Sequence, residues 1–193
     1  MSEPAPPKNF DQPRQRVQAN MPEQETSDEY GTSKAIPSEM ADAARQEILD
    51  SIAASDPDLL TREFDHPLNY RPYTAKTREA AKELVENADK DILANLTGIP
   101  AGDIADRFNK AFPVLFVKTT VSPYHMRGGR PNRVWTFIAF GRLTFEIGLP
   151  APSSTRFDLT LESGDALHIR GDVDMWFSGG GGGTALLADW KVY

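Results

Sequence analysis

Short apolar runs alternate with turn residues throughout the C-terminal part of the chain. After Pro113 these runs are rich in β-branched and aromatic side chains and are separated by Gly, Pro, Ser or Asn, which is typical of β-strands joined by tight turns. The predicted strands are Val114–Val121, Arg133–Phe140, Leu143–Ile147, Arg156–Leu161, Ala166–Arg170, Val173–Phe177 and Thr184–Val192. So many short strands in one segment indicate an antiparallel jelly roll or β-sandwich, which we place at residues 113–193.

Before Pro113, apolar residues recur at the spacing of an α-helix. Ala41, Ala44, Ile48 and Ile52 recur at helical spacing after Pro37-Ser38, a favourable start for a helix. The predicted elements are helices over residues 37–56, Thr74–Leu96 and Asp103–Phe112, with an irregular, aromatic strap at Asp58–Tyr73. Residues 37–112 are therefore expected to form a helical layer over one face of the sheet, which makes the fold class α+β.

The first 36 residues show neither pattern. They are rich in proline, glutamine and acidic residues, and their large apolar side chains are few and scattered. Such a segment cannot bury enough apolar surface to offset the entropy of its chain. We expect residues 1–36 to be disordered, or to form an extended arm that wraps a protein partner or a second copy of this chain.

Composition narrows the classes of protein to consider. There is no cysteine, which excludes disulfides, thiolate metal sites and cysteine nucleophiles. No apolar run is long enough to span a membrane, and the N-terminus lacks the apolar segment of a secretory signal. We therefore expect a cytoplasmic protein, or one held within an assembled particle, with no membrane partner.

Charge is distributed unevenly. Residues 1–60 hold 12 acidic and five basic residues, so the whole formal charge of −7 lies in that third of the chain. Between Arg107 and Arg156 there are eight basic residues and one acid, Glu146. The candidate residues for binding an anion or an acidic partner are Arg127, Arg130, Arg133 and Arg142. Nucleic acid is one candidate partner for this stretch, and the chain's own acidic N-terminal part is another.

One stretch carries a family resemblance. Leu161-Glu162 is followed by Gly164-Asp165, and Phe177-Ser178-Gly179 places an aromatic residue before a polar position and a glycine. Upstream, residues 136–141 form an apolar run that ends in glycine. Over about Val114–Gly180 the chain resembles the double-stranded β-helix of Fe(II)/2-oxoglutarate-dependent oxygenases, and most of all the AlkB-type branch that repairs alkylated nucleic acids.

The resemblance implies an iron site made by two His and one carboxylate, with 2-oxoglutarate as co-substrate. In this register the His-x-Asp/Glu triplet of the family falls on His125-Met126-Arg127, so an arginine stands at the carboxylate position, and the second His falls on Ser178. We therefore expect neither iron nor 2-oxoglutarate to bind in the manner of the family. If a site is rebuilt from other residues, its candidates are His125, His168 and Asp174.

These observations support three hypotheses about function. The leading one is a non-catalytic structural or interaction protein on an oxygenase-like jelly roll, for which a component of a virus or phage particle is a candidate by analogy. The second is an Fe(II)/2-oxoglutarate dioxygenase that acts on nucleic acid with displaced ligands. The third is an anion- or nucleic-acid-binding module that uses the basic stretch.

Overall fold

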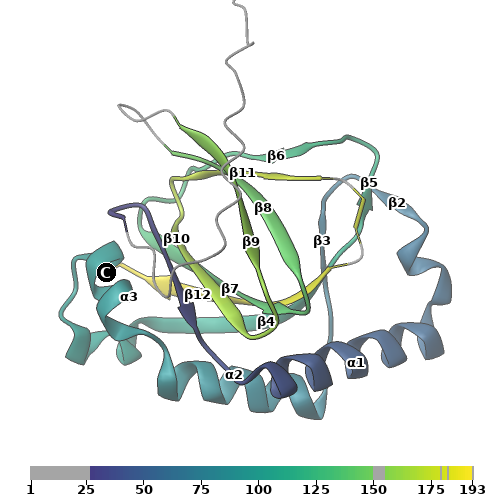
Figure 1. The fold of residues 1–193 in the computed structure, drawn as a ribbon, viewed down its shortest axis with the longest axis horizontal. Coiled ribbons are helices and arrows are strands. Elements are labelled where there is room, and N and C mark those ends of the chain that lie inside the picture. The colour runs from purple at the N-terminus through teal and green to yellow at the C-terminus, as the bar shows by residue number, and fades with distance from the viewer. Residues whose placement is uncertain (1–26, 150–154, 179, 182, 193) are drawn as a thin grey trace, which may run out of the picture.

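Two antiparallel sheets form the centre of the computed structural model, which describes residues 27–149, 155–178, 180–181 and 183–192. The larger sheet has six strands in the spatial order β1 (Tyr30–Lys34), β10 (Asp165–Arg170), β7 (Arg133–Phe140), β12 (Thr184–Lys191), β4 (Phe108–Phe116) and β3 (Leu68–Tyr70). The smaller sheet has four, in the order β6 (Tyr124–Met126), β11 (Asp174–Phe177), β8 (Leu143–Gly148) and β9 (Arg156–Leu161). A parallel pair, β2 (Glu63–Phe64) and β5 (Lys118–Thr119), lies outside them. The two sheets face each other as the halves of a jelly roll (Figure 1), and the predicted α+β jelly-roll class is confirmed.

The space between the sheets is filled with apolar side chains. Residues of both sheets that share one face of their strands form a single buried cluster: Leu68, Val114, Phe116, Phe137, Ala139, Leu143, Phe145, Ile147, Leu159, Leu161, Leu167, Ile169, Val173, Met175, Phe177, Ala185 and Leu187. Because side chains alternate between the two faces of a strand, the residues between these members point away from the barrel interior.

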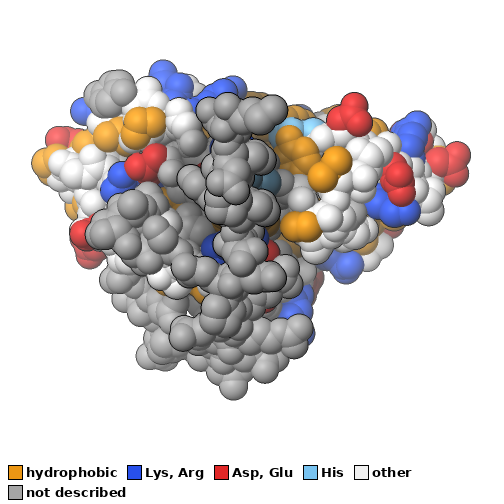
Figure 2. All heavy atoms as spheres, turned by 90° about the horizontal axis from the view of Figure 1, so that it is seen from above, with side chains coloured by type: hydrophobic (Ala, Val, Ile, Leu, Met, Phe, Trp, Pro, Cys, Tyr) orange, Lys and Arg blue, Asp and Glu red, His pale blue; other side chains and the backbone are white. Residues whose placement is uncertain are grey.

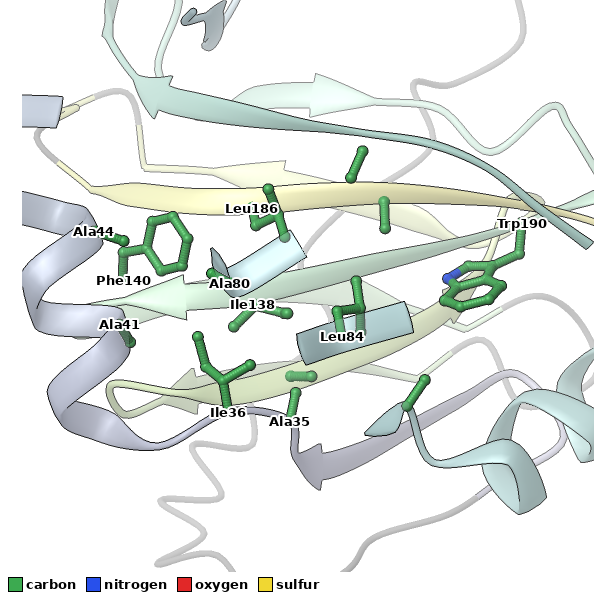
Figure 3. Packing of buried hydrophobic residues seen from close by; sticks show 14 of the residues in the cluster. Ala35, Ile36, Ala41, Ala44, Ala80, Leu84, Ile138, Phe140, Leu186 and Trp190 are labelled. Atoms are coloured by element: carbon green, nitrogen blue, oxygen red, sulfur yellow. The ribbon is translucent and has the colours of Figure 1, made fainter. Parts of the chain in front are cut away.

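Helices cover the outer face of the larger sheet (Figure 1). They are α1 (Ser38–Ser55), α2 (Ala75–Asn87) and α3 (Lys90–Thr97). A 3₁₀ turn at Pro57–Leu60 follows α1, and two more, Ala101–Asp103 and Ala105–Arg107, lie between α3 and β4. Figure 3 shows Ala41 and Ala44 of α1, and Ala80 and Leu84 of α2, against the helix-facing side of the sheet. Small alanines let the helices approach the strands closely, and each fully buried Leu or Ile contributes roughly 1.5–3 kcal/mol. None of the described helices is both long and apolar enough to cross a membrane.

The helix predicted for Thr74–Leu96 is broken in two. Ala88 has extended backbone angles, and Asp89 caps the start of α3, where its Oδ1 accepts from the backbone N–H of Ile92 at 3.0 Å. An aspartate competes for backbone donors and favours a cap over the interior of a helix. Gly98, with φ +69°, ends α3 in the left-handed region that glycine adopts without strain.

The helix predicted for Asp103–Phe112 is wrong over its second half. After two 3₁₀ turns the chain enters β4, which pairs with β12 over most of its length. Ile104, Phe108 and Phe112 are spaced four apart, which fits a helix, but a spacing of four also keeps two residues on one face of a strand. The segment forms a strand because its backbone pairs with β12. A shift in register at Asp189–Trp190 lets the ring of Phe108 pack edge-on against Trp190, with ring centroids 5.3 Å apart.

The expected arm is folded where the structure describes it. Tyr30–Lys34 forms β1, which pairs with β10, and Ile36 is buried beyond it. The prediction of a disordered or partner-wrapping arm was therefore wrong for residues 27–36, because backbone hydrogen bonds to β10 and buried hydroxyls compensate for the scarcity of apolar side chains. Residues 1–26 lie outside the described part of the chain.

A chain of side-chain hydrogen bonds crosses four neighbouring strands on the helix-facing side of the larger sheet. Trp190 Nε1 of β12 donates to Thr136 Oγ1 of β7 at 2.9 Å. Thr136 Oγ1 lies 2.9 Å from His168 Nδ1 of β10, and His168 Nε2 lies 2.9 Å from Ser33 Oγ of β1. An indole N–H can only donate, so the threonine hydroxyl is free to donate to Nδ1 and His168 carries its proton on Nε2. All four groups are buried and satisfied in this arrangement.

Replacing Thr136 with valine tests the value of this chain to the fold. The variant T136V keeps the shape but leaves the Trp190 N–H and His168 Nδ1 without a partner, so we expect a loss of about 2 kcal/mol or more in the free energy of unfolding. The matched control is T144V, which removes an exposed hydroxyl that lies 2.9 Å from Thr160 Oγ1 on the outer face of the smaller sheet. The control should change stability by less than about 0.5 kcal/mol, and equal losses measured by urea denaturation would contradict a special role for Thr136.

Candidate functional site

His125 lies on the outside of the barrel. Its neighbours on β6, Tyr124 and Met126, pack against the apolar cluster between the sheets, so alternation turns His125 the other way. Its ring stacks on Trp176 of β11 with centroids 4.4 Å apart and planes 4° apart, and its Nε2 lies 3.1 Å from Asp174 Oδ2. The side chains of His125 and Asp174 are 33% and 38% exposed, so this contact contributes little to stability.

The stack continues across the outer face of the smaller sheet. The Arg156 guanidinium lies 3.9 Å from the centre of the Trp176 ring and pairs with Glu146. Gly148 makes room for the indole, since a Cβ at this position would lie 2.5 Å from the Trp176 ring. The rings of His125 and Trp176 and the guanidinium of Arg156 thus form one row on the outer face of the smaller sheet. Asp174 contacts His125, and Glu146 contacts Arg156.

Asp174 also fixes the start of the loop of residues 127–132, which joins β6 to β7, carries Arg127 and Arg130, and is called the basic loop below. Its Oδ1 accepts from the Gly128 N–H at 2.7 Å. Gly128 sits so close to the turn after β10 that a Cβ would lie 2.1 Å from the Asp172 carbonyl oxygen. The N–H groups of Gly129 and Arg130 both donate to the Gly171 carbonyl, at 3.0 and 2.9 Å. The loop is therefore fixed to a neighbouring turn by its backbone, and its arginine side chains are presented from a firm base.

His168 belongs to a different part of the molecule. It is fully buried on the helix-facing side of β10, with both ring nitrogens in hydrogen bonds to hydroxyls. Of the three candidate ligands His125, His168 and Asp174, the structure therefore brings together only His125 and Asp174. His168 instead forms hydrogen bonds to Thr136 and Ser33. In the described part of the chain, no three His, Cys, Asp or Glu side chains are grouped closely enough to hold a metal ion.

The strand pairing separates Ser178 from His125. Ser178 was assigned to the second His, but β11 pairs with β6 so that Trp176 lies opposite His125 and Met175 opposite Met126. Ser178 therefore lies beyond the far end of this pairing, where its carbonyl accepts from the Ser122 hydroxyl at 2.5 Å. Asp174 is the residue of β11 that faces the triplet.

The four candidate arginines do not form one group. Arg130 and Arg133 line a pocket at one end of the barrel. Arg142 lines a different pocket, with Ser178 and Phe116, and its Nε lies 3.5 Å from Glu162. Arg127 is exposed on the loop and lines neither pocket.

Sequence reasoning missed the buried partner of Arg133. The Arg133 guanidinium donates to Asp189 Oδ2 at 2.8 Å, and Asn109 Nδ2 donates to the same oxygen at 2.7 Å. Asp189 is 5% exposed and lines the pocket with both partners. The available signal was a single acid within the otherwise apolar run from Ala185 to Trp190.

Comparison with known proteins identifies the fold and nothing finer. No protein-family model and no curated protein sequence matches the chain. Similar solved structures include the non-heme α-ketoglutarate-dependent epimerase SnoN from nogalamycin biosynthesis, with a TM-score of 0.54 and 10% identity over 83% of this chain and 76% of that one. A Pseudomonas putida prolyl-4-hydroxylase has a TM-score of 0.51 and 12% identity over 84% and 91% of the two chains. A Trichoplax adhaerens prolyl hydroxylase, solved with a peptide fragment of the hypoxia inducible factor oxygen degradation domain, has a TM-score of 0.54 and 9% identity over 86% and 84%.

These likenesses confirm the resemblance to Fe(II)/2-oxoglutarate oxygenases at the level of the fold. The described residues do not fit an iron centre inside this barrel. The inward positions on β6 and β11 hold Tyr124, Met126, Met175 and Phe177, which pack in the apolar cluster and offer no carboxylate or imidazole. The two donors that meet, His125 and Asp174, lie on the outer surface.

His168 makes the stability of the protein depend on pH. Burial is the main cause that lowers its pKa from 6.5 to about 4, against a smaller opposite effect of Asp89. The unfolded chain takes up this proton below about pH 6.5 and the folded chain only near pH 4, so stability falls as the pH drops through this window, on the order of 3 kcal/mol in total. We expect the Cε1–H resonance of His168 to stay constant from pH 7 to about pH 5 in an NMR titration. A titration of this resonance with a midpoint near 6.5 would show that His168 is accessible to water.

Proposed function

We propose that this chain is a non-catalytic binding protein built on an oxygenase-like jelly roll. One observation carries the proposal: the barrel interior is a continuous apolar core, and the candidate metal donors face away from it. Conversion of an enzyme into a binding protein needs only the loss of its metal ligands, since the sheets are held by apolar packing and backbone ladders that do not depend on them.

The enzyme hypothesis has less support from the described residues. It draws on the solved structures, whose low identities to this chain speak for the fold alone. A displaced centre would need a third donor beside His125 and Asp174, and His168 is committed to Thr136 and Ser33. Two exposed donors on one surface are a weak site for a divalent ion, because structural and catalytic metal sites use three or more protein ligands.

Binding of nucleic acid through the basic stretch is also less favoured. Lys118 pairs with Glu63 at 2.8 Å, Arg133 with Asp189, and Arg142 with Glu162. Where Figure 2 shows described residues, Asp and Glu side chains lie beside Lys and Arg side chains on part of the face. A protein that follows a phosphate backbone presents its cations along one surface. The further expectation of a particle component with a partner-wrapping arm rests on residues 1–26, outside the described part.

Metal titration tests the proposal. With metal-free protein under anaerobic conditions, we expect no stoichiometric binding of Fe²⁺ or Mn²⁺ by calorimetry, with or without 2-oxoglutarate. In a separate assay in air, with Fe²⁺ and 2-oxoglutarate, we expect no succinate above the level formed by Fe²⁺ alone, because no inward-facing donors hold the ion.

The variant H125A and the matched surface variant H66A separate a real site from incidental binding. Weak uptake that both variants reduce alike would be the effect of exposed histidines and agrees with the proposal. Tight binding of one equivalent that H125A abolishes and H66A preserves, together with succinate formation, would overturn it.

A further inference from the structure

A polar pocket opens at one end of the barrel. Its walls come from β3, β4, β7, β12 and the basic loop, and it encloses about 520 Å³ of space not occupied by atoms, its mouth included. The residues that line it are Tyr70, Asn109, Lys110, Phe112, Arg130, Arg133, Trp135, Leu187 and Asp189. Leu187 belongs to the apolar cluster between the sheets, and Phe112 and Trp135 pack against that cluster. The pocket therefore lies where the apolar filling of the barrel ends.

One carboxylate oxygen of Asp189 accepts no hydrogen bond from the described residues. Its Oδ2 receives both Asn109 and Arg133, whereas its Oδ1 is buried without a hydrogen-bond partner in the described part of the chain. It is the one side-chain atom in this condition among the described residues. A buried carboxylate oxygen without a partner is costly, so such a position in a pocket points to a donor supplied from outside the chain.

The charge around the pocket favours an anion. Three cationic side chains, Lys110, Arg130 and Arg133, face one carboxylate, Asp189. Arg133 is paired with Asp189, but neither Lys110 nor Arg130 forms an ion pair with any described carboxylate. Lys110 and Arg130 are exposed at the rim, where a ligand anion can reach them without a large desolvation cost.

The walls suit a planar group. Tyr70 and Phe112 meet edge to face with ring centroids 5.4 Å apart, and Lys110 Nζ lies 4.8 Å from the Phe112 ring centre. Trp135 lines the same space from β7. Tyr70 is 56% exposed although it is a large aromatic residue, and a planar ligand would cover part of its surface.

We propose that this pocket binds a small planar anion that also bears an N–H or O–H donor. The donor hydrogen-bonds to Asp189 Oδ1, the anionic group lies between Lys110 and Arg130, and the planar part packs on the aromatic wall. The inference rests on the proposed function in that the pocket serves binding and not turnover. Its test uses no metal, so failure here leaves the metal titration unaffected.

Simple aromatic probes separate the three features. The three aminobenzoate isomers carry anion, ring and donor, benzoate lacks the donor, and aniline lacks the anion. We expect at least one aminobenzoate to bind with a Kd on the order of 1 mM, as befits about ten heavy atoms, and roughly tenfold more tightly than benzoate or aniline. In NMR spectra the indole N–H of Trp135 should shift, while those of Trp176 and Trp190, which lie on other faces, should not.

Two variants locate the binding. R130Q should weaken the aminobenzoate severalfold, whereas R127Q, an exposed arginine of the same loop outside the pocket, should leave it unchanged. In D189N the amide oxygen must face Asn109 and Arg133, because both of these donate hydrogen bonds. The amide NH₂ then takes the place of Oδ1, and the position can no longer accept a hydrogen bond from a ligand. The preference for aminobenzoate over benzoate should then vanish.

Several results would overturn the inference. If no probe shifts Trp135 at tens of millimolar, or if benzoate binds as well as every aminobenzoate, Asp189 Oδ1 is satisfied by an ordered water and no ligand is needed. Equal weakening by R127Q and R130Q would mean non-specific attraction of anions. Should D189N fail to fold, the comparison of R130Q with R127Q still decides the outcome.

Discussion

Strand alternation determines which chemistry this barrel can hold. Along β6 and β11 every second side chain points between the sheets, and those positions are taken by Tyr124, Met126, Met175 and Phe177. His125 has the opposite parity and therefore lies outside, on Trp176. A shift of one residue would exchange the two sets, but it would also expose the apolar ones, which the packing of the core prevents. The apolar packing between the sheets therefore fixes the register of β6 and β11 and keeps His125 on the outer face.

Two groups of buried polar side chains join neighbouring strands of the larger sheet. On the helix-facing side, the hydrogen bonds from Trp190 to Ser33 join four strands and tie the N-terminal β1 to the sheet. At one end of the barrel, Asp189 gathers Asn109 and Arg133 from two neighbouring strands. The first network is complete, so it serves structure. The second leaves a buried acceptor open, which is why we assign a binding role to it.

Much of the fold could be predicted from the sequence. Arg133–Phe140 and Arg156–Leu161 form strands with the predicted bounds, and α1 buries the predicted apolar stripe. Those segments have strong periodicity and clear turn or cap residues at their ends. The segments that failed have neither: β1 is short and polar, and Phe108–Phe116 contains a proline and a spacing that suits both helix and strand.

The candidate site was harder to predict, because it depends on pairing between distant segments. His125 and Asp174 were both candidates, and their meeting follows from the register of β6 on β11. His168 was also a candidate, but nothing in its local sequence shows that β1 supplies Ser33 as its partner. Asp189 was missed altogether, since its role appears only when Asn109 and Arg133 are brought beside it. The resemblance to oxygenases predicted the fold correctly, and it placed the second ligand position at Ser178, just after β11.

We propose that no metal ion enters the barrel interior, and methyl NMR of the methionines tests this. With ¹³C-labelled methionine methyl groups, Met175 reports from inside the barrel, and Met40, packed beside the helices, serves as a remote reference. On addition of one equivalent of Mn²⁺ the account predicts that the Met175 signal keeps the same width relative to Met40. Selective broadening of Met175 at one equivalent that persists in H125A, where the exposed pair of donors is lost, would place the ion between the sheets and contradict the proposal.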